Sequence, residues 1–365
     1  MKLTDAFTFD NGLTLKNRVV MAPMTIGACK ADGKVSQDDI SYYAKRAEHV
    51  GMIITGCACI DPLGEAFENS YRVFDESCIP GLSQLAQTIQ HKGAKAILQI
   101  YHGGRMVFPD VIKSTPVAPS AIKAPRNFTA QPRALSAKEV DDLMQKFLNA
   151  IHYAIQAGFD GVELHGANTY LLQQFVSPHS NRRRDKWGGS ANNRMRFSKT
   201  LVKKAKKLIA DEATKPFILG YRFSPEEIEE PGITLHDTLQ LLEQLIIHGI
   251  DYLHISSSHV WRSSIRYTDN NEPIIEKIVQ KINQRVPLIA VGDIHTKDDV
   301  NRIMDANIPL FALGKALLLD PEWPVKIAND RQDEIITIYR DELQHHLALP
   351  SRFVQDLRGY LEGDY

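Results

Sequence analysis

The sequence predicts an α/β protein built as a (β/α)8 TIM barrel. Eight short apolar runs rich in β-branched residues recur along its 365 residues, each continuous as expected for parallel strands buried on both faces. Helical patterns separate these runs, and polar residues stand at or just past most of their ends. In a closed barrel all strand ends meet on one face, where the active site is built. The predicted strands are Val19–Pro23, Met52–Cys57, Ala96–Tyr101, Gly161–His165, Phe217–Arg222, Tyr252–Ser256, Leu288–Val291 and Leu310–Gly314.

Helix starts and stops support this reading. Ser136 and Glu139 form a capping box ahead of an apolar-periodic stretch that runs to Ala157. Weaker starts and four glycine stops are predicted elsewhere, at Ser36, Thr234 and Thr296, and at Gly51, Gly93, Gly158 and Gly249.

An open doubly wound sheet is the competing architecture. No Rossmann Gly-x-Gly-x-x-Gly follows the first strand, which counts against it. The proline-rich stretch His102–Ser136 predicts an elaborated loop over the barrel mouth after the third strand. No linker divides the chain, so we expect a single domain over residues 1–365, with a tail from about 330 to 365 packing on the barrel.

Composition narrows the function classes. Forty-four acidic residues against 43 basic ones leave a net charge of −1, which predicts neither a nucleic-acid nor an anionic-membrane partner. The first ten residues lack the apolar segment of a signal peptide, so we expect a cytoplasmic protein. The four cysteines form no Cys-x-x-Cys pair and predict neither a disulfide scaffold nor a metal site.

Three polar residues lie at the end of the fourth predicted strand or within five positions after it. His165 and Asn168 lie three apart on a turn and are suited to direct N–H donors at one oxygen, polarising a carbonyl. Tyr170 offers a proton without carrying charge. The alternative is that the first two cap the next helix and Tyr170 only packs.

Several further motifs then make a family resemblance visible. Their order and spacing over nearly the whole chain resemble the old yellow enzyme family of FMN-dependent NAD(P)H oxidoreductases. The matching segments are Asn17-Arg-Val-Val-Met-Ala-Pro-Met-Thr25, Gln99-Ile-Tyr-His-Gly-Gly-Arg105, Glu163-x-His-x-x-Asn-x-Tyr-Leu171, Ser177-Pro-x-x-Asn-x-Arg-x-Asp-x-Trp-Gly-Gly-Ser190, Gly220-Tyr-Arg-Phe-Ser224, Val291-Gly-Asp-Ile294 and Leu313-Gly-Lys315.

The resemblance implies an enzyme that reduces activated C=C bonds, such as those of α,β-unsaturated carbonyl compounds, with NADH or NADPH by ping-pong hydride transfer. His165 and Asn168 would bind the oxygen of the electron-withdrawing group, so that the β-carbon accepts hydride from reduced FMN. Tyr170 matches the donor of a proton to the α-carbon.

The resemblance also implies a set of FMN-binding residues. Thr25 would touch the flavin near O4 and N5, Gln99 would pair with its pyrimidine edge, and Arg222 would stabilise negative charge near N1. His165 lies in the same site. The remaining matches are Pro23, Met24 and Cys57 along the ring, and Gly292, Asp293, Gly314 and Lys315 at the phosphate end.

Three departures from the family pattern affect these assignments. Lys315 stands where many members have arginine, so a contact to phosphate would come from the single charge of an ammonium group and not from a bidentate guanidinium. Thr25 replaces the redox-tuning cysteine of one branch, and Gly27 replaces that branch's active-site tyrosine, which implies a different or roomier pocket. The short stretch after Gly314 leaves no room for the added flavin module of longer members, so we expect NAD(P)H to reduce the FMN directly.

Three other functions compete with this one. A dihydrouridine synthase-like barrel would require a basic surface, and a flavin-free aldolase would require a lysine inside the strand ends. A non-catalytic flavin-binding protein stays open. The sequence identifies neither the small electrophilic acceptor nor the choice of NADH or NADPH, and it is compatible with a homo-oligomer.

Overall fold

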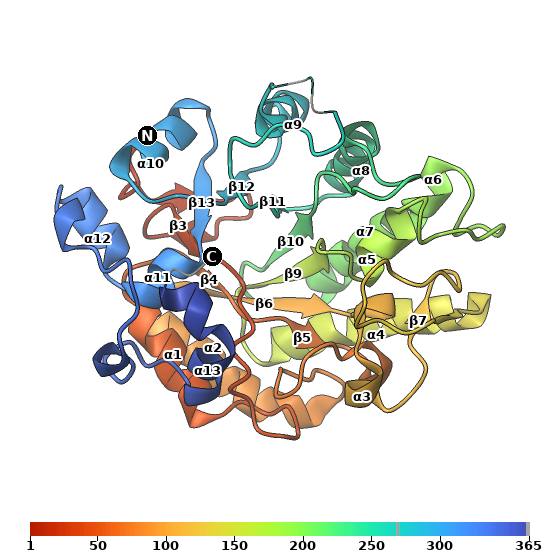
Figure 1. Cartoon of the computed structure of the whole chain (residues 1–365), viewed down its shortest axis with the longest axis horizontal. Helices are drawn as coiled ribbons and strands as arrows, with labels where there is room; N and C mark the ends of the chain where they lie inside the picture. The colour runs from red at the N-terminus through yellow and green to blue at the C-terminus, as the bar shows by residue number, and fades with distance from the viewer. Residues whose placement is uncertain (268, 270, 363–365) are drawn as a thin grey trace.

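Eight parallel strands close into a barrel in the computed structural model, which describes residues 1–267, 269 and 271–362 (Figure 1). Each strand pairs with the next along the chain, and the last pairs with the first through Ala312 and Val20. All eight predicted strands are present, so the predicted TIM barrel is confirmed. They are β3 (Val19–Met21), β4 (Met52–Ile54), β6 (Lys95–Tyr101), β9 (Gly161–Gly166), β10 (Ile218–Phe223), β11 (Tyr252–Ile255), β12 (Leu288–Val291) and β13 (Leu310–Leu313).

Helices surround the barrel, and their starts follow the sequence signals closely. All four predicted starts form complete capping boxes, three of them with Asp in place of Glu. The helices are α1 (Gln37–Ala47), α2 (Ile79–His91), α3 (Pro109–Ile112), α4 (Ala137–Gln156), α5 (Leu171–Val176), α6 (Ala191–Arg194), α7 (Arg196–Glu212), α8 (Leu235–Ile247), α9 (Ile274–Ile282), α10 (Lys297–Asp305), α11 (Lys315–Leu319), α12 (Trp323–Ala328) and α13 (Ser351–Glu362).

Three of the four predicted glycine stops have the left-handed backbone that favours glycine, with φ between 80° and 89° at Gly93, Gly158 and Gly249. The prediction for Gly51 is wrong, because α1 already ends at Ala47. A Cβ at Gly51 would lie 2.2 Å from the carbonyl oxygen of Asn17, so close backbone approach explains this glycine.

Two apolar layers hold the fold together. The larger packs the helices on the outside of the barrel, and a second cluster fills the inside with residues such as Val20, Met52 and Ile97. An N-terminal hairpin of β1 (Phe7–Thr8) and β2 (Thr14–Leu15), which the sequence analysis did not predict, adds Phe9, Leu13 and Leu15 to that inner cluster. The hairpin closes the end of the barrel where the strands begin, so the open mouth lies where they end.

Two segments elaborate this framework. The predicted loop over residues 102–136 contains α3, β7 (Val117–Ala118) and β8 (Arg133–Ala134), while β5 (Ala58–Cys59) extends the sheet beside β6. The C-terminal segment packs on α1, where the buried Arg46 guanidinium donates to the carbonyl oxygen of Leu347 at 3.0 Å. None of the helices in the described residues has the length and apolarity needed to cross a membrane.

Candidate active site

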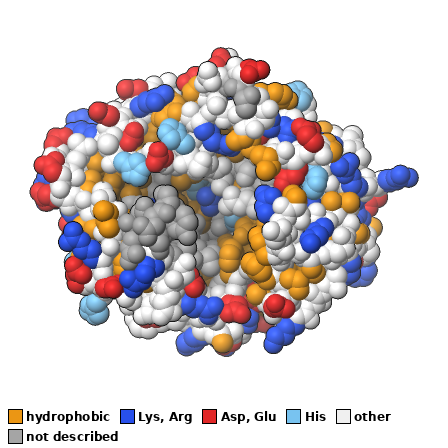
Figure 2. Space-filling view, viewed as in Figure 1, with side chains coloured by type: hydrophobic (Ala, Val, Ile, Leu, Met, Phe, Trp, Pro, Cys, Tyr) orange, Lys and Arg blue, Asp and Glu red, His pale blue; other side chains and the backbone are white. Residues whose placement is uncertain are grey.

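The polar strand ends converge at the barrel mouth. Arg222 of β10 is in register with His165 on β9 and His254 on β11, and Gln99 of β6 is in register with Glu163 of β9. Figure 2 shows this face hollowed near its centre, with cationic and histidine side chains inside and hydrophobic ones along the border. The mouth therefore places charge and hydrogen-bonding groups beneath an apolar rim.

His165 is a neutral hydrogen-bond donor. Its Nδ1 accepts the backbone N–H of Ala167 at 3.3 Å, so the single proton of the neutral ring belongs on Nε2. Burial lowers the pKa of His165 well below its usual value, and the neighbouring Arg222 and His254 lower it further. At neutral pH the ring can polarise an oxygen without adding a positive charge.

Two serines that the sequence analysis did not assign to the site orient Asn168. The Ser256 hydroxyl donates to Asn168 Oδ1 at 2.8 Å, and the backbone N–H of Asn168 donates to Ser224 Oγ at 3.0 Å. The Asn168 backbone has φ of 55°, a conformation that asparagine tolerates better than most residues. Because Ser256 occupies the amide oxygen, the amide nitrogen is left to act as the donor.

Tyr170 packs edge-on against His165, with ring centroids 4.9 Å apart, and its ring is tilted against that of Tyr101, with centroids 5.3 Å apart. Phe67 lies against it at 6.4 Å. Burial and the nearby Cys57 raise the pKa of the Tyr170 phenol far above its ordinary value, although Arg222 opposes them. The phenol is therefore protonated at neutral pH, as an acid must be before it donates.

The first and second barrel strands supply another wall. Thr25 and Cys57 share a hydrogen bond of 3.4 Å between Oγ1 and Sγ, and burial raises the pKa of the Cys57 thiol to about 11. A Cβ at Gly314 would lie 3.6 Å from Met24 Sδ. The ends of the first and last strands therefore bring Met24, a predicted contact of the flavin ring, close to Gly314, a predicted contact of the phosphate. Pro23 is half-buried beside them.

A buried polar cluster lies inside the barrel below these groups. Gln99 donates from Nε2 to Glu163 at 2.7 Å, and His254 Nδ1 lies 2.9 Å from the other carboxylate oxygen. The Glu163 and His254 side chains are fully buried. The sequence analysis missed both, although Glu163 stands two residues before His165 and strand alternation puts the two on one face.

The seventh and eighth strands end at the predicted phosphate contacts. Gly292 has φ of 118°, and a Cβ there would lie 2.6 Å from the backbone nitrogen of His259, so only glycine fits. The carboxylate of Asp293 is exposed and lies 2.6 Å from His295 Nε2. Any contact from Asp293 to an anion would therefore come from its backbone. Lys315 begins α11 directly after Gly314.

The residues present fit a planar anionic heterocycle that carries a phosphate. Arg222 Nε is buried without a hydrogen-bond partner in the described part of the chain, and Arg222 lies in register with His165 near the ends of β10 and β9. The turn at Gly292 after β12 leaves backbone groups accessible to the phosphate end of such a molecule. Over the described residues, no three His, Cys, Asp or Glu side chains are grouped in a way that could hold a metal.

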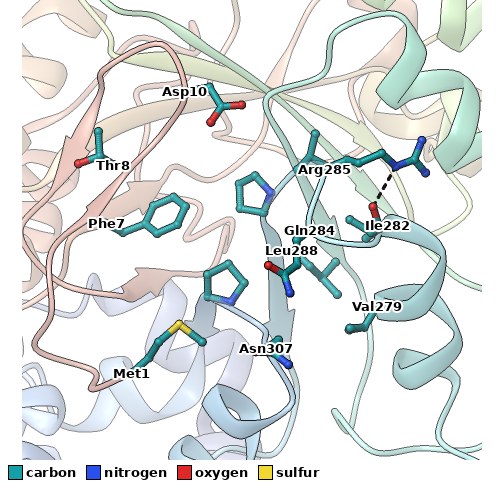
Figure 3. Close-up of a pocket in the computed structure, with 13 residues that line it drawn as sticks. Met1, Phe7, Thr8, Asp10, Val279, Ile282, Gln284, Arg285, Leu288 and Asn307 are labelled. Carbon is teal, nitrogen blue, oxygen red and sulfur yellow. Dashed lines mark hydrogen bonds between the residues drawn. The ribbon is translucent and has the colours of Figure 1, made fainter.

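A second cavity, of about 310 Å³, lies beside the closed end of the barrel (Figure 3). Phe7, Leu288 and Asn307 line it, and its cation Arg285 is already held by both carboxylate oxygens of Glu243 at 2.9 Å. None of the predicted site residues lines this cavity.

A closed TIM barrel that gathers neutral hydrogen-bond donors and a buried cation at one mouth is an arrangement typical of flavin-binding TIM-barrel oxidoreductases. The sequence profile of the NADH:flavin oxidoreductase / NADH oxidase family matches residues 2–334. The chain belongs to this family, which confirms the resemblance to old yellow enzyme proteins and the expectation of FMN with a nicotinamide donor.

Individual relatives and a solved structure are consistent with membership of this family. An NADH:fumarate oxidoreductase of Klebsiella pneumoniae (strain 342) is 46% identical over 338 residues, which cover 92% of this chain and 36% of that protein. The chain thus spans about a third of that relative's length. A "Probable NADH-dependent flavin oxidoreductase" of Bacillus subtilis (strain 168) is 41% identical over 95% of this chain and 94% of its own. The structure of morphinone reductase superposes with a TM-score of 0.79 at 26% identity, over 90% of each chain.

Proposed function

We propose that this chain takes hydride from NAD(P)H through FMN and delivers it to the β-carbon of a small acceptor whose C=C bond is activated by a carbonyl or carboxyl group. The observation that carries the proposal is the pairing of two neutral donors, His165 Nε2–H and the Asn168 amide, beside the protonated Tyr170 phenol. Neutral donors suit an oxygen whose negative charge grows during the reaction.

The flavin site follows from the residues around the mouth. Gln99 and Thr25 would hold the ring edge, Arg222 would lie near its pyrimidine end, and the Gly292 and Gly314 backbones would receive the phosphate, with Lys315 close by. The remaining predicted contacts, Pro23, Met24, Cys57, His165 and Asp293, complete this proposal. When bound, FMN supplies the reversible two-electron hydride chemistry that no amino-acid side chain provides.

The chain's own residues then act on the acceptor. His165 and Asn168 bind and polarise its oxygen, which makes the β-carbon electron-poor. Tyr170 holds a proton on its phenol oxygen and donates it to the α-carbon. The rings of Tyr101 and Phe67, packed around Tyr170, limit access of water to that proton.

Anaerobic titration of the FMN-loaded protein tests this proposal. NADH or NADPH should bleach the visible flavin bands, and 2-cyclohexenone, acrylate or fumarate should restore them with one equivalent of saturated product. Fumarate and acrylate are included because the Klebsiella relative is named for fumarate and a Vibrio harveyi relative for acrylate. The paired variant His165→Ala/Asn168→Ala should still be bleached but should reoxidise at least tenfold more slowly. Failure of all three acceptors, with reoxidation by dioxygen alone, would refute the proposal.

A further inference from the structure

Glu163 and His254 form a buried pair to which the proposed reaction assigns no role. Both side chains have zero exposure, and they join strands β9 and β11 across the inside of the barrel. One carboxylate oxygen of Glu163 accepts from Gln99 Nε2 at 2.7 Å, and the other lies 2.9 Å from His254 Nδ1. Both oxygens are therefore occupied, and Gln99 is the one member of the three that is predicted to touch the flavin.

The ionisation state of this pair decides which way the Gln99 amide faces. Burial favours protonation of Glu163, but the hydrogen bond from His254 and the positive charge of Arg222 outweigh it and lower the pKa of the carboxyl group. A carboxylate only accepts hydrogen bonds, so it requires the amide nitrogen of Gln99 on its side. The Gln99 carbonyl oxygen is then left facing away from Glu163. For the same reason His254 donates from Nδ1.

The surroundings of the pair leave little room for another arrangement. A Cβ at Gly220 would lie 1.9 Å from Tyr252 Cζ, so the Tyr252 ring fills the space above this glycine. Arg222 lies in register with His254 on the adjacent strand, and its positive charge acts on both members of the pair. Burial holds His254 neutral by lowering its pKa, against the opposing effect of Glu163. The carboxylate therefore stays the fixed acceptor of the cluster.

We infer that Glu163 and His254 are positioning residues that hold Gln99 with its carbonyl oxygen available to a ligand, so that the site accepts a ring edge bearing an imide N–H. The N3–H of the flavin pyrimidine ring is such a donor. An amide turned the other way would present N–H to N–H and repel the same edge. The inference rests on the proposed placement of FMN over Gln99.

The N3–H itself provides the test. FMN labelled with nitrogen-15 at N3 is bound to the protein, and the exchange rate of the N3 proton with solvent is measured by NMR. Glu163→Gln preserves shape but allows either amide orientation at Gln99, so we expect exchange at least tenfold faster than in the wild type with FMN still bound. If that variant does not fold, His254→Phe removes the imidazole donor to Glu163 and should speed exchange at least threefold.

Two comparisons make the outcome decisive. Asp160→Asn changes another buried carboxylate that accepts from a glutamine amide, Gln90 Nε2 at 2.9 Å, at the opposite end of β9. It should lower stability without altering N3–H exchange. Gln99→Leu should speed exchange by itself. Fast exchange in Gln99→Leu with wild-type exchange in a folded Glu163→Gln would overturn the positioning role alone. Wild-type exchange in both would overturn the placement of FMN and the inference with it.

Discussion

A neutral histidine has one donor and one acceptor, and in His165 the acceptor is already occupied. The backbone N–H of Ala167 occupies Nδ1, which leaves Nε2–H as the donor. In the same way, the Ser256 hydroxyl donates to the amide oxygen of Asn168 and leaves the amide nitrogen as the donor. At the scale of single residues, the proposed preference for an oxygen ligand therefore depends on neighbours that occupy the accepting atom of each side chain and leave its donor toward the site.

Loss of the Tyr170 hydroxyl should separate the two half-reactions. Tyr170→Phe keeps the ring that packs on His165 and Tyr101, and removes only the hydroxyl that we propose as the proton donor. We expect normal flavin reduction by NAD(P)H and a loss of about 10²–10⁴-fold in enone reduction, the usual range for a positioned general acid. Quinones should be less affected, because their reduced oxygens take protons from water.

Stopped-flow absorbance of each half-reaction measures this effect. Tyr153→Phe on the outer helix α4 serves as the control and should change neither rate. Equal slowing of both half-reactions in Tyr170→Phe would make Tyr170 a packing residue, and no change would assign the proton to water.

Ser256 should affect ligand affinity through Asn168. Without the Ser256 hydroxyl, the Asn168 amide is free to turn its oxygen toward the ligand. One lost hydrogen bond is worth about 0.5–1.5 kcal/mol, so Ser256→Ala should weaken phenol binding roughly 2- to 12-fold. Titration of the long-wavelength phenol–flavin band measures the dissociation constant. The adjacent Ser257 donates to a backbone oxygen of its own loop, and Ser257→Ala should leave the affinity unchanged; the same loss in both variants would argue against the orienting role.

At the scale of secondary-structure elements, the sequence predicted the strands well because buried parallel strands are apolar throughout. It also predicted that His165, Asn168 and Arg222 gather at the mouth, since each follows or ends a strand. The contact between Glu163 and His254 was out of reach, because it joins residues 91 positions apart and depends on strand register. The strands of the N-terminal hairpin are two residues long, too short for a readable pattern.

Gly220 shows how one strand leaves room for its neighbour. Gly220→Ala would drive a Cβ into the Tyr252 ring, and such overpacking costs about 1–3 kcal/mol. Tyr252→Leu alone leaves a void and costs about 2–5 kcal/mol. In the double variant the added Cβ occupies part of the space that the Tyr252 ring has vacated. The loss of unfolding free energy should therefore be at least about 1 kcal/mol smaller than the sum of the losses in the two single variants. Urea denaturation of all four proteins measures this coupling, and additivity would mean that the ring and the glycine do not compete for space.

At the scale of the whole molecule, a net charge of −1 makes general charge repulsion a weak influence on stability near neutral pH. Buried titratable groups matter more. Burial lowers the pKa values of three histidines inside the fold, His102, His165 and His254. Each stays neutral in the native state at a pH where the unfolded chain would take up a proton, so acidification favours unfolding.

His102 gives the clearest case, because burial alone lowers its pKa to about 3 from an ordinary value of 6.5. Between these two values the unfolded state binds one more proton than the native state. The wild-type free energy of unfolding should therefore fall as the pH decreases below about 6.5, with His102 contributing a slope of up to about 1.4 kcal/mol per pH unit. His102→Asn keeps an acceptor for the backbone N–H of Gly104 and removes the titrating ring. We expect the unfolding free energy of this variant to depend less steeply on pH than that of the wild type. Urea unfolding at intervals from pH 6.5 to pH 4 measures the slope. The control variant His346→Asn, at an exposed position, should retain the wild-type slope. Coincident slopes for His102→Asn and the wild type would show that His102 takes up its proton in the native state.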